Sequence, residues 1–188
     1  SMVDDFTGEF VKRVNAMKAG NGLEQTVRIG PLVGPEAVEK VENQVKDALE
    51  KGAPLLTGGE RLAENGLDKG YFYAPTVLSN VTPDMLIYRE ETFGPVAPVI
   101  GYDPGNDDVM EMANDTDYGL AAYVYTQNTS RAMRAFEQLR FGIIGINDIN
   151  PTSAAAPFGG MKESGMGREG ASEGINEYLE TKLGGFSI

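Results

Sequence analysis

Residues 118–146 read YGLAAYVYTQNTSRAMRAFEQLRFGIIGI, and the alternation of predicted strands and helices is most regular here. Its two apolar runs, residues 121–126 and 141–146, have the length and composition of buried strands. Between them, residues 130–140 carry large apolar side chains every third position, which predicts a helix. The inward side chains expected on this helix are Met133, Phe136 and Leu139. A strand, a helix and a second strand in this order are typical of a parallel α/β unit.

The same alternation continues on both sides of this unit. Further helices are predicted over residues 4–18, 36–51, 107–114 and 169–180, and further strands over 54–57, 71–81 and 96–102. The first of these helices is expected to bury Phe6, Phe10, Val11, Val14 and Met17, and the second Val38, Val41, Val45, Ala48 and Leu49. The expected fold is α/β, with a mostly parallel open sheet and flanking helices.

Several connections of this predicted fold carry local signals. Residues 54–57 are expected to be a buried strand, and Pro75 indicates an edge or a bend in the strand over 71–81. Residues 82–88 are expected to turn into another extended piece, and residues 60–70 and 147–168 to form loops. Ligands bind beyond the carboxyl ends of strands in open α/β sheets. The candidate loops are those after Tyr88, after Ile146 and around Gly119.

Composition excludes several kinds of site. The 188 residues carry 28 acidic against 16 basic side chains, a net charge of -12 that disfavours nucleic acid as a partner. The sequence has no cysteine and no histidine, so it can form no disulfide and has no thiol nucleophile and no imidazole base. The commonest metal ligands are absent for the same reason. We expect no metal site, no membrane span, no signal peptide and a cytoplasmic location.

A first motif, residues 90–95 (EETFGP), combines two carboxylates, an aromatic ring and a rigid bend. A carboxylate can accept hydrogen bonds from both hydroxyls of a ribose, and an aromatic ring can pack against a planar base. The alternative is a solvated acidic pair before a turn, with Phe93 in the core. The chemistry of these residues alone favours that alternative.

A second motif, residues 114–122 (NDTDYGLAA), is typical of a junction between a helix and a strand. Leu120 is a candidate for lining a ligand pocket, and a core position is its alternative. A third motif, residues 157–169 (PFGGMKESGMGRE), is a glycine-rich loop whose amides could cradle a phosphate. It has neither the Walker ending nor the glycine spacing of a dinucleotide fingerprint. A packed loop, tied to its neighbours by Arg168 and Glu169, is the favoured interpretation.

These three motifs, in this order and at these separations, resemble the aldehyde dehydrogenase superfamily. The resemblance covers essentially the whole chain, and it also includes residues 30–32 (GPL) with the helix that follows them. Residues 156–170 and 177–182 (EYLETK) are most similar to the succinate-semialdehyde dehydrogenase branch. The resemblance implies part of a Rossmann-like catalytic domain.

The resemblance also implies a chemistry. In this family a cysteine thiolate attacks the aldehyde, an oxyanion hole stabilises the adduct, hydride passes to NAD or NADP, and a glutamate activates the water that releases the acid. The cysteine, the base and the dinucleotide-binding domain lie upstream of the region matched here. We therefore expect no catalytic residue in this chain, no turnover by the chain alone and no cofactor bound by it.

Some site residues follow from the same resemblance. Glu91 matches the glutamate that binds the nicotinamide ribose, Phe93 matches the aromatic beside it, and Leu120 is predicted to be a third cofactor contact. Thr152 and Ser153 belong to the loop at the substrate entrance, where a serine of the succinate-semialdehyde branch helps hold the substrate carboxylate. Residues 150–154 (NPTSA) depart from that branch's usual pattern, so the identity of the aldehyde stays open. The predicted role of Phe158 is in the aromatic wall of the substrate pocket, with a packed loop anchor as its alternative.

The expected organisation has three parts. Residues 1–2 are interpreted as an expression scar, residues 3–180 as the C-terminal part of the catalytic domain, and residues 181–188 as a segment that pairs with a neighbouring subunit. A homo-oligomer and a small aldehyde substrate are expected for the full-length enzyme. The alternatives are a non-catalytic oligomerisation or interaction module and a nucleotide-binding domain without catalysis. Loss of upstream strands would expose sheet edges, so we expect the fragment to self-associate.

Overall fold

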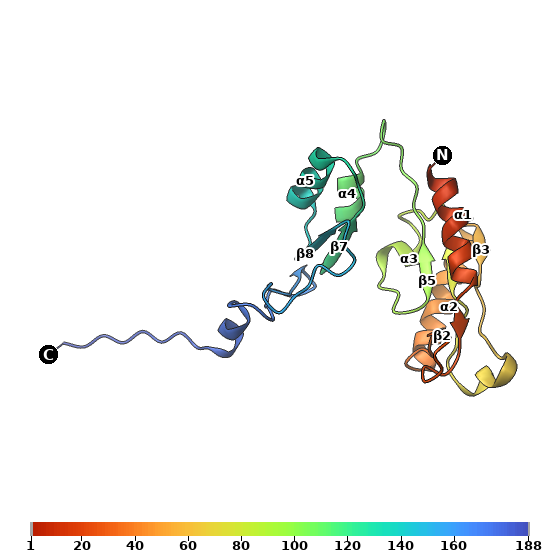
Figure 1. The fold of residues 1–188 in the computed structure, drawn as a ribbon, viewed down its shortest axis with the longest axis horizontal. Coiled ribbons are helices and arrows are strands. Elements are labelled where there is room, and N and C mark those ends of the chain that lie inside the picture. Colours follow the sequence, from red (N-terminus) through yellow and green to blue (C-terminus); the bar gives the residue numbers. More distant parts are fainter. Residues whose placement is uncertain (1, 188) are drawn as a thin grey trace. The chain divides into compact units, whose positions relative to one another are not determined.

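The computed structural model describes residues 2–187 and divides into two compact units, residues 1–102 and 103–188. Ser1, from the interpreted scar, and Ile188, from the predicted terminal segment, lie outside the described residues. Both units are mixed α/β with small open sheets (Figure 1). The predicted boundaries at 3–180 and 181–188 stay a prediction, because compactness alone does not define the domains of a longer protein.

The first unit alternates helices with short strands. Its elements are α1 (Met2–Asn15), β1 (Lys18–Ala19), β2 (Val27–Ile29), α2 (Pro35–Glu50), β3 (Leu55–Thr57), the 3-10 helix η1 (Glu64–Lys69), β4 (Thr76–Leu78), α3 (Leu86–Arg89) and β5 (Val96–Pro98). β1 pairs parallel with β2, and β3, β4 and β5 form a sheet in that order. The predicted loop over residues 60–70 contains η1.

Helix α2 supplies the core of the first unit because its apolar residues repeat at helical spacing. Its buried face packs with residues of β4, of the chain before β4 and before α3, and of α3 itself; the cluster includes Val38, Val41, Val45, Ala48, Tyr73, Leu78, Met85 and Ile87. Pro35 begins the helix and Gly52, at φ 93°, follows its end, as helix-boundary chemistry predicts. The predicted helix over residues 36–51 is confirmed, but Leu49 is exposed.

Strand β4 is the centre of the three-stranded sheet, with β3 antiparallel on one side and β5 parallel on the other. All three of its residues are buried. Of the two interpretations of Pro75, an edge strand or a bend, the edge strand is therefore wrong. Pro75 immediately precedes β4, where its missing N–H costs no bond of the sheet ladder.

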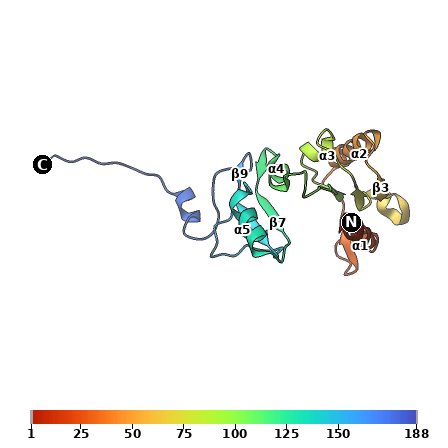
Figure 2. The same ribbon diagram turned by 90° about the horizontal axis from the view of Figure 1, so that it is seen from above.

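Three other expectations for the first unit are corrected. Leu55 and Leu56 of β3 are exposed rather than buried, because β3 is an edge strand of its sheet. Residues 86–89 form the short helix α3 against α2 instead of an extended piece (Figure 2). Its first turn is held by Asp47, whose Oδ2 accepts a hydrogen bond from the Leu86 N–H at 2.8 Å. α1 ends at Asn15, before Met17, because the next residues pair with β2.

The second unit contains the strand, helix and strand from which the fold was predicted. Its elements are α4 (Val109–Asn114), β6 (Tyr118–Gly119), β7 (Ala121–Val124), α5 (Thr129–Gln138), β8 (Ile143–Ile146), β9 (Met161–Lys162) and the 3-10 helix η2 (Gly174–Tyr178). β7 and β8 pair parallel, from Ala121 opposite Ile143 to Val124 opposite Ile146. β6 and β9 pair antiparallel. Among the described residues, parallel pairs thus outnumber antiparallel ones, but they lie in separate small sheets.

The predicted burial of α5 is only partly right. Ala135 and Leu139 are buried, whereas Met133 and Phe136 are 53% and 58% exposed. Helical spacing identifies the apolar side of a helix, but it does not provide the element that covers it. Of the predicted helix over 169–180, only the short 3-10 helix η2 is present, and its Ile175 is exposed. Phe6, on the predicted apolar face of α1 in the first unit, is exposed as well.

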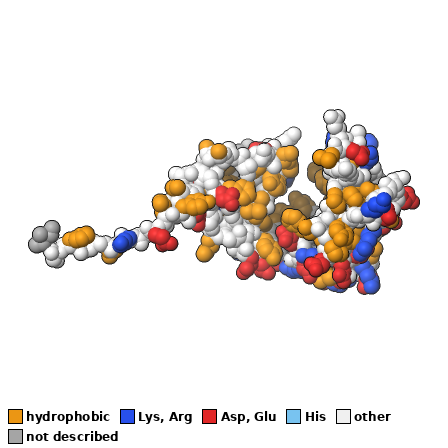
Figure 3. All heavy atoms as spheres, turned by 90° about the horizontal axis from the view of Figure 1, so that it is seen from below, with side chains coloured by type: hydrophobic (Ala, Val, Ile, Leu, Met, Phe, Trp, Pro, Cys, Tyr) orange, Lys and Arg blue, Asp and Glu red, His pale blue; other side chains and the backbone are white. Residues whose placement is uncertain are grey.

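The chain after Leu179 is irregular and exposed up to Ser187. Figure 3 shows apolar side chains along this terminal segment in contact with solvent, and Leu183 and Phe186 are 97% and 92% exposed. Its course is extended (Figure 1), and no strand pairing is present there in the described chain.

Candidate functional site

The Glu-x-Phe-Gly-Pro segment lies in the first unit, between α3 and β5. The N–H of Glu90 donates to the Leu86 carbonyl at 2.9 Å, and the N–H of Thr76 in β4 donates to the Pro95 carbonyl at 2.8 Å. Both ends of residues 90–95, which we call the EETFGP loop, are therefore attached to regular structure.

Gly94 lets the EETFGP loop pass directly over the core. A Cβ atom at this position would lie 2.5 Å from Cγ2 of the buried Val41, which is too close for any residue but glycine without movement of α2. Phe93, in contrast, is 83% exposed, and Glu91 is exposed as well. The interpretation of Phe93 as a core residue is wrong, and both predicted cofactor contacts of this loop are open to a ligand.

A buried amide holds the loop on either side of Glu91. Gln44 is 1% exposed; its Nε2 donates to Glu90 Oε2 at 3.3 Å, and its Oε1 accepts from the Thr92 hydroxyl at 2.8 Å. Sequence reasoning missed Gln44. The available signal was an amide on the buried stripe of α2, where a polar side chain requires hydrogen-bond partners.

A cavity of about 380 Å³ lies beside this network, between α2 and α3. Its lining includes Glu36, Glu39 and Glu90 but a single ammonium group, that of Lys40. Three carboxylates around one cavity repel the pyrophosphate of a dinucleotide. This cavity is therefore a poor site for the phosphates, and the loop residues offer only ribose and ring contacts.

In the second unit, Asn147 joins the carboxyl ends of β7 and β8. Its N–H donates to the Val124 carbonyl at 2.8 Å, and its side chain exchanges two bonds of 2.9 Å with the backbone of Thr126. Asn147 has φ 54°, in the left-handed region that asparagine tolerates better than most residues. The loop after Ile146, one of the predicted ligand loops, starts from this fixed point.

Thr152 and Ser153 are exposed on that loop. The Thr152 hydroxyl donates to Asn150 Oδ1 at 2.9 Å, and the Ser153 carbonyl accepts from the Ala156 N–H at 3.0 Å. These bonds fold residues 150–156 locally and leave the Ser153 hydroxyl at the surface. Neither residue lines the large cavity of this unit.

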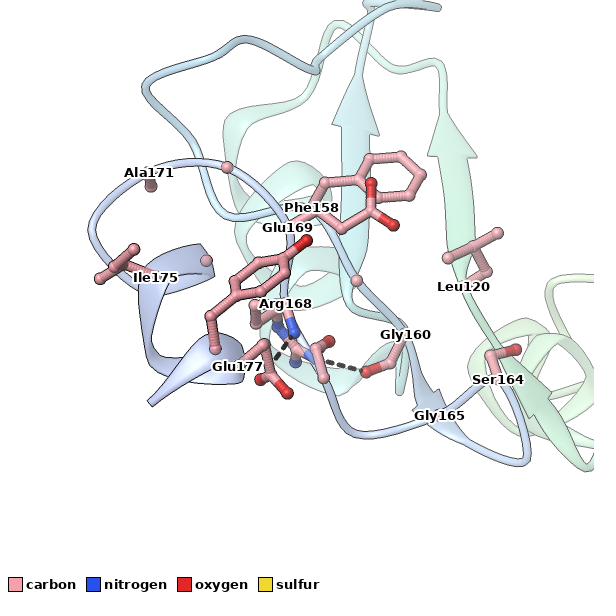
Figure 4. Close-up of a pocket in the computed structure, with 15 residues that line it drawn as sticks. Leu120, Phe158, Gly160, Ser164, Gly165, Arg168, Glu169, Ala171, Ile175 and Glu177 are labelled. Carbon is pink, nitrogen blue, oxygen red and sulfur yellow. Dashed lines mark hydrogen bonds between the residues drawn. The ribbon is translucent and has the colours of Figure 1, made fainter. Parts of the chain in front are cut away.

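That large cavity, of about 830 Å³, brings Leu120 and Phe158 together (Figure 4). Leu120 precedes β7, and Phe158 is fixed by reciprocal backbone bonds with Glu169, of 2.8 and 2.7 Å. Both side chains are partly exposed. One was predicted for the cofactor and the other for the substrate, and they border the same space.

The glycine-rich loop is held by its own arginine. Arg168 Nη1 donates to the carbonyls of Gly160, Met166 and Gly167, at 2.8, 3.2 and 2.8 Å, and the Arg168 N–H donates to Glu177 (Figure 4). The Glu177 carboxylate adds a negative charge next to the loop. The geometry supports the packed loop over a phosphate cradle, because Nη1 of the guanidinium is directed to these three carbonyls.

Close packing explains two of the glycines of this loop. A Cβ atom at Gly159 would lie 2.3 Å from the Gly167 carbonyl oxygen, and one at Gly160 would lie 2.5 Å from the Ser164 Cβ. Gly165 has open space around it, but its φ of 98° favours glycine. Within residues 2–187, no three Asp, Glu, His or Cys side chains are grouped to hold a metal ion. In the same range, none of the helices combines the length and apolarity needed to cross a bilayer.

The sequence signature of the aldehyde dehydrogenase family matches residues 1–183, and the chain belongs to this family. It is 47% identical over 182 residues to a non-phosphorylating aspartate-semialdehyde dehydrogenase of Halomonas elongata, covering 97% of this chain and 36% of the relative. It is also 47% identical over 180 residues to the mitochondrial succinate-semialdehyde dehydrogenase of Rattus norvegicus, covering 95% and 34%.

A 3-sulfolactaldehyde dehydrogenase of Pseudomonas putida is 44% identical over 183 residues, with 96% of this chain and 37% of the relative covered. The chain thus spans about a third of the length of the curated relatives it matches. The predicted family is confirmed, and relatives with three different named substrates are found at nearly the same identity.

Solved structures agree with the fold. An aldehyde dehydrogenase of Brucella melitensis biovar abortus 2308 superposes with a TM-score of 0.88 at 47% identity, over 96% of this chain and 36% of that one. A betaine aldehyde dehydrogenase of Staphylococcus aureus in complex with NAD+ gives 0.88 at 38% identity, over 95% and 35%. The chain has the fold of part of an aldehyde dehydrogenase.

Proposed function

We propose that this chain is the C-terminal part of an NAD(P)-dependent aldehyde dehydrogenase that oxidises an aldehyde, with succinate semialdehyde as the first candidate, to its carboxylic acid. In this proposal Glu91, Phe93 and Leu120 contact the cofactor, and Thr152, Ser153 and Phe158 border the substrate. When bound, a nicotinamide cofactor would supply the hydride acceptor for this oxidation. This chain contributes binding and orientation, and the bond-making groups come from the rest of the enzyme.

The observation that carries the cofactor role is the exposure of Glu91 and Phe93 on a loop anchored at both ends. A fixed carboxylate suits the two hydroxyls of a ribose, and a free aromatic face suits a planar ring. These residues therefore fit the nicotinamide end of a dinucleotide. The relative from Staphylococcus aureus was solved with NAD+, which supports the same class of cofactor.

The substrate class follows from the chemistry of the relatives' substrates. Succinate semialdehyde, aspartate semialdehyde and 3-sulfolactaldehyde each carry a carboxylate or a sulfonate besides the aldehyde. The exposed Ser153 hydroxyl is a donor that suits such an anion and would gain nothing from a quaternary ammonium group. We therefore propose an anionic aldehyde as the substrate of the complete enzyme.

The 188-residue chain should have no turnover of its own, because it contains no cysteine to attack the aldehyde. Purified chain is mixed with each of the three anionic aldehydes and with NAD+ or NADP+, and reduced cofactor is followed by absorbance. The expected rate equals the blank. A rate above the blank from chain of verified sequence would overturn the assignment of catalysis to the missing part.

The complete enzyme tests the substrate class. We expect its kcat/KM for succinate semialdehyde to exceed that for betaine aldehyde, and Ser153→Ala to lower it about tenfold through a lost hydrogen bond to a charged group. Ser130→Ala, at an exposed position of α5, is the matched control and should leave kcat/KM unchanged. Equal use of betaine aldehyde would contradict an anionic substrate.

We also propose that the complete enzyme is a homo-oligomer in which residues 181–188 pair with a neighbouring subunit. The support is the extended, exposed course of this segment up to Ser187. Deletion of residues 181–188 should lower the oligomeric state measured by light scattering. A cytoplasmic location is proposed as well; several relatives, including that from Rattus norvegicus, are mitochondrial, and cell fractionation distinguishes the two locations.

A further inference from the structure

Gln44 is a buried polar side chain of α2 that neither the proposed catalysis nor the proposed contacts with the ligands use. We infer that Gln44 is the positioning residue of the EETFGP loop, fixing the direction in which Glu91 and Phe93 meet the cofactor. This inference rests on the proposed function, since it concerns the cofactor role of the loop.

The alternation of side chains explains how one amide can set that direction. Glu90 has an extended backbone, with φ -97° and ψ 144°, and successive side chains of an extended chain point to opposite sides. The two side chains bound by Gln44 are those of Glu90 and Thr92. The residues between and after them, Glu91 and Phe93, are exposed; Glu90 is exposed as well, and Thr92 is half-buried. Holding positions 90 and 92 toward α2 therefore turns positions 91 and 93 outward.

The amide cannot give up these bonds at low cost. Gln44 is 1% exposed, so an unpaired amide at this place would have no access to water. The two ends of the Gln44 amide differ, and each has a suitable hydrogen-bond partner. The NH₂ group donates to a carboxylate, and the carbonyl oxygen accepts from a hydroxyl. This match fixes the orientation of the amide and pairs each loop residue with one end of it.

The support of Gln44 is itself rigid. Gln44 lies between Val41 and Val45 on the buried stripe of α2. Val41 also meets the loop directly, at Gly94. The loop is therefore held against one helix at three successive points, which are the side chains of Glu90 and Thr92 and the backbone of Gly94.

A charge exchange tests the inference in the complete enzyme. Gln44→Glu keeps an acceptor for Thr92 but places a carboxylate against Glu90, so we expect the KM for the cofactor to rise about tenfold. The KM for the aldehyde should stay within about twofold. The double variant Gln44→Glu/Glu90→Gln exchanges amide and carboxylate, and it should restore the KM for the cofactor. Asn43→Asp, exposed on the same helix, controls for the added charge and should leave it unchanged.

A second readout uses the 188-residue chain without cofactor. Gln44→Glu should speed hydrogen exchange in peptides covering residues 86–98, and the double variant should restore slow exchange. Gln44→Met, which keeps the volume and loses both bonds, should speed exchange in the same peptides while the far-ultraviolet circular dichroism of the chain stays unchanged. Unchanged exchange in both single variants would overturn the inference.

Glu91→Gln separates the two levels of the proposal. If Glu91→Gln raises the KM for the cofactor and Gln44→Glu does not, the positioning role of Gln44 is overturned and the cofactor role of the loop stands. If the double variant fails to restore the KM, the pairing with Glu90 is overturned. If Glu91→Gln leaves the KM unchanged, the proposed function of the loop fails, and the positioning role fails with it.

Discussion

Lys162 Nζ donates to the backbone carbonyl of Asn114 across 3.2 Å, while the Asn114 side chain holds the end of another helix. Asn114 Nδ2 donates to the Gln138 carbonyl and its Oδ1 accepts from the Arg140 N–H, both at 2.8 Å. The ends of α4 and α5 and the strand β9 of the glycine-rich loop therefore meet at one asparagine.

Asn114→Ala should destabilise the second unit by about 0.5–1.5 kcal/mol, because two exposed hydrogen bonds to the backbone at the end of α5 are lost. Hydrogen exchange of peptides from residues 103–187 should accelerate, with peptides of residues 2–102 unaffected. Asn114→Asp keeps the acceptor for Arg140 and loses the donor to Gln138, so an intermediate effect is expected. Equal exchange in Asn114→Ala and the wild-type chain would refute the shared anchor.

Gly94→Ala should destabilise the first unit by about 1–3 kcal/mol, since the added methyl group meets Val41 in a packed core. Urea unfolding followed by circular dichroism measures the change. Gly8→Ala is the matched control. It lies in α1 with open space around it and should be neutral or stabilising by up to about 1 kcal/mol. A Gly94→Ala chain as stable as wild type would show that α2 yields at this point.

Tyr73 should make the chain sensitive to alkali. Burial, with the nearby Glu42 and Glu60 carboxylates, raises the pKa of the Tyr73 phenol from 10.0 to about 12. The folded state then binds the phenol proton more tightly than the unfolded chain does. The contribution of the protonated phenol to the stability of the fold is therefore complete below pH 10 and is lost as the pH rises toward 12.

Urea midpoints measured between pH 8 and pH 11 give the test for Tyr73. The wild-type midpoint should fall more steeply above pH 10 than that of Tyr73→Phe, which has no proton to lose. Tyr71→Phe, at an exposed neighbour, should behave like wild type. Parallel curves for wild type and Tyr73→Phe would contradict the raised pKa.

Phe93→Ala should separate stability from binding. The ring is 83% exposed, so the unfolding free energy of the isolated chain should change by less than about 0.5 kcal/mol. In the complete enzyme the KM for the cofactor should rise by about threefold to tenfold, through loss of a stacking surface. Leu23→Ala, 92% exposed in the same unit, should change neither quantity. A large loss of stability would show that Phe93 has a structural role.

Local sequence pattern predicted those elements whose partners are close in the chain. α2 was predicted within one residue at each end, because its apolar repeat, its proline and the glycine after it act locally. β7 and β8 were predicted for the same reason. Burial was predicted less well: Met133 and Phe136 have the right spacing for a core face and are exposed, because spacing does not specify a covering element.

The same contrast between local sequence and long-range packing applies to the predicted site. The motif containing Glu91 and Phe93 could be found as a contiguous string, and the structure showed that both side chains are exposed. Gln44 lies 46 residues before Glu90, so no local pattern connects the two. The two residues meet only because α2 packs against the EETFGP loop in the folded chain. The predicted roles of Thr152 and Ser153 stay predictions.

The Arg168 anchor has a consequence for protein engineering. Arg168 binds backbone carbonyls, which every residue possesses, and the side chains of Met161, Glu163 and Met166 along the same loop are exposed. A library that randomises these three positions would leave the anchor in place, whereas changes at the packed glycines would dislodge it. The exposed side chains of this loop can therefore be exchanged while its backbone and the rest of the chain stay the same.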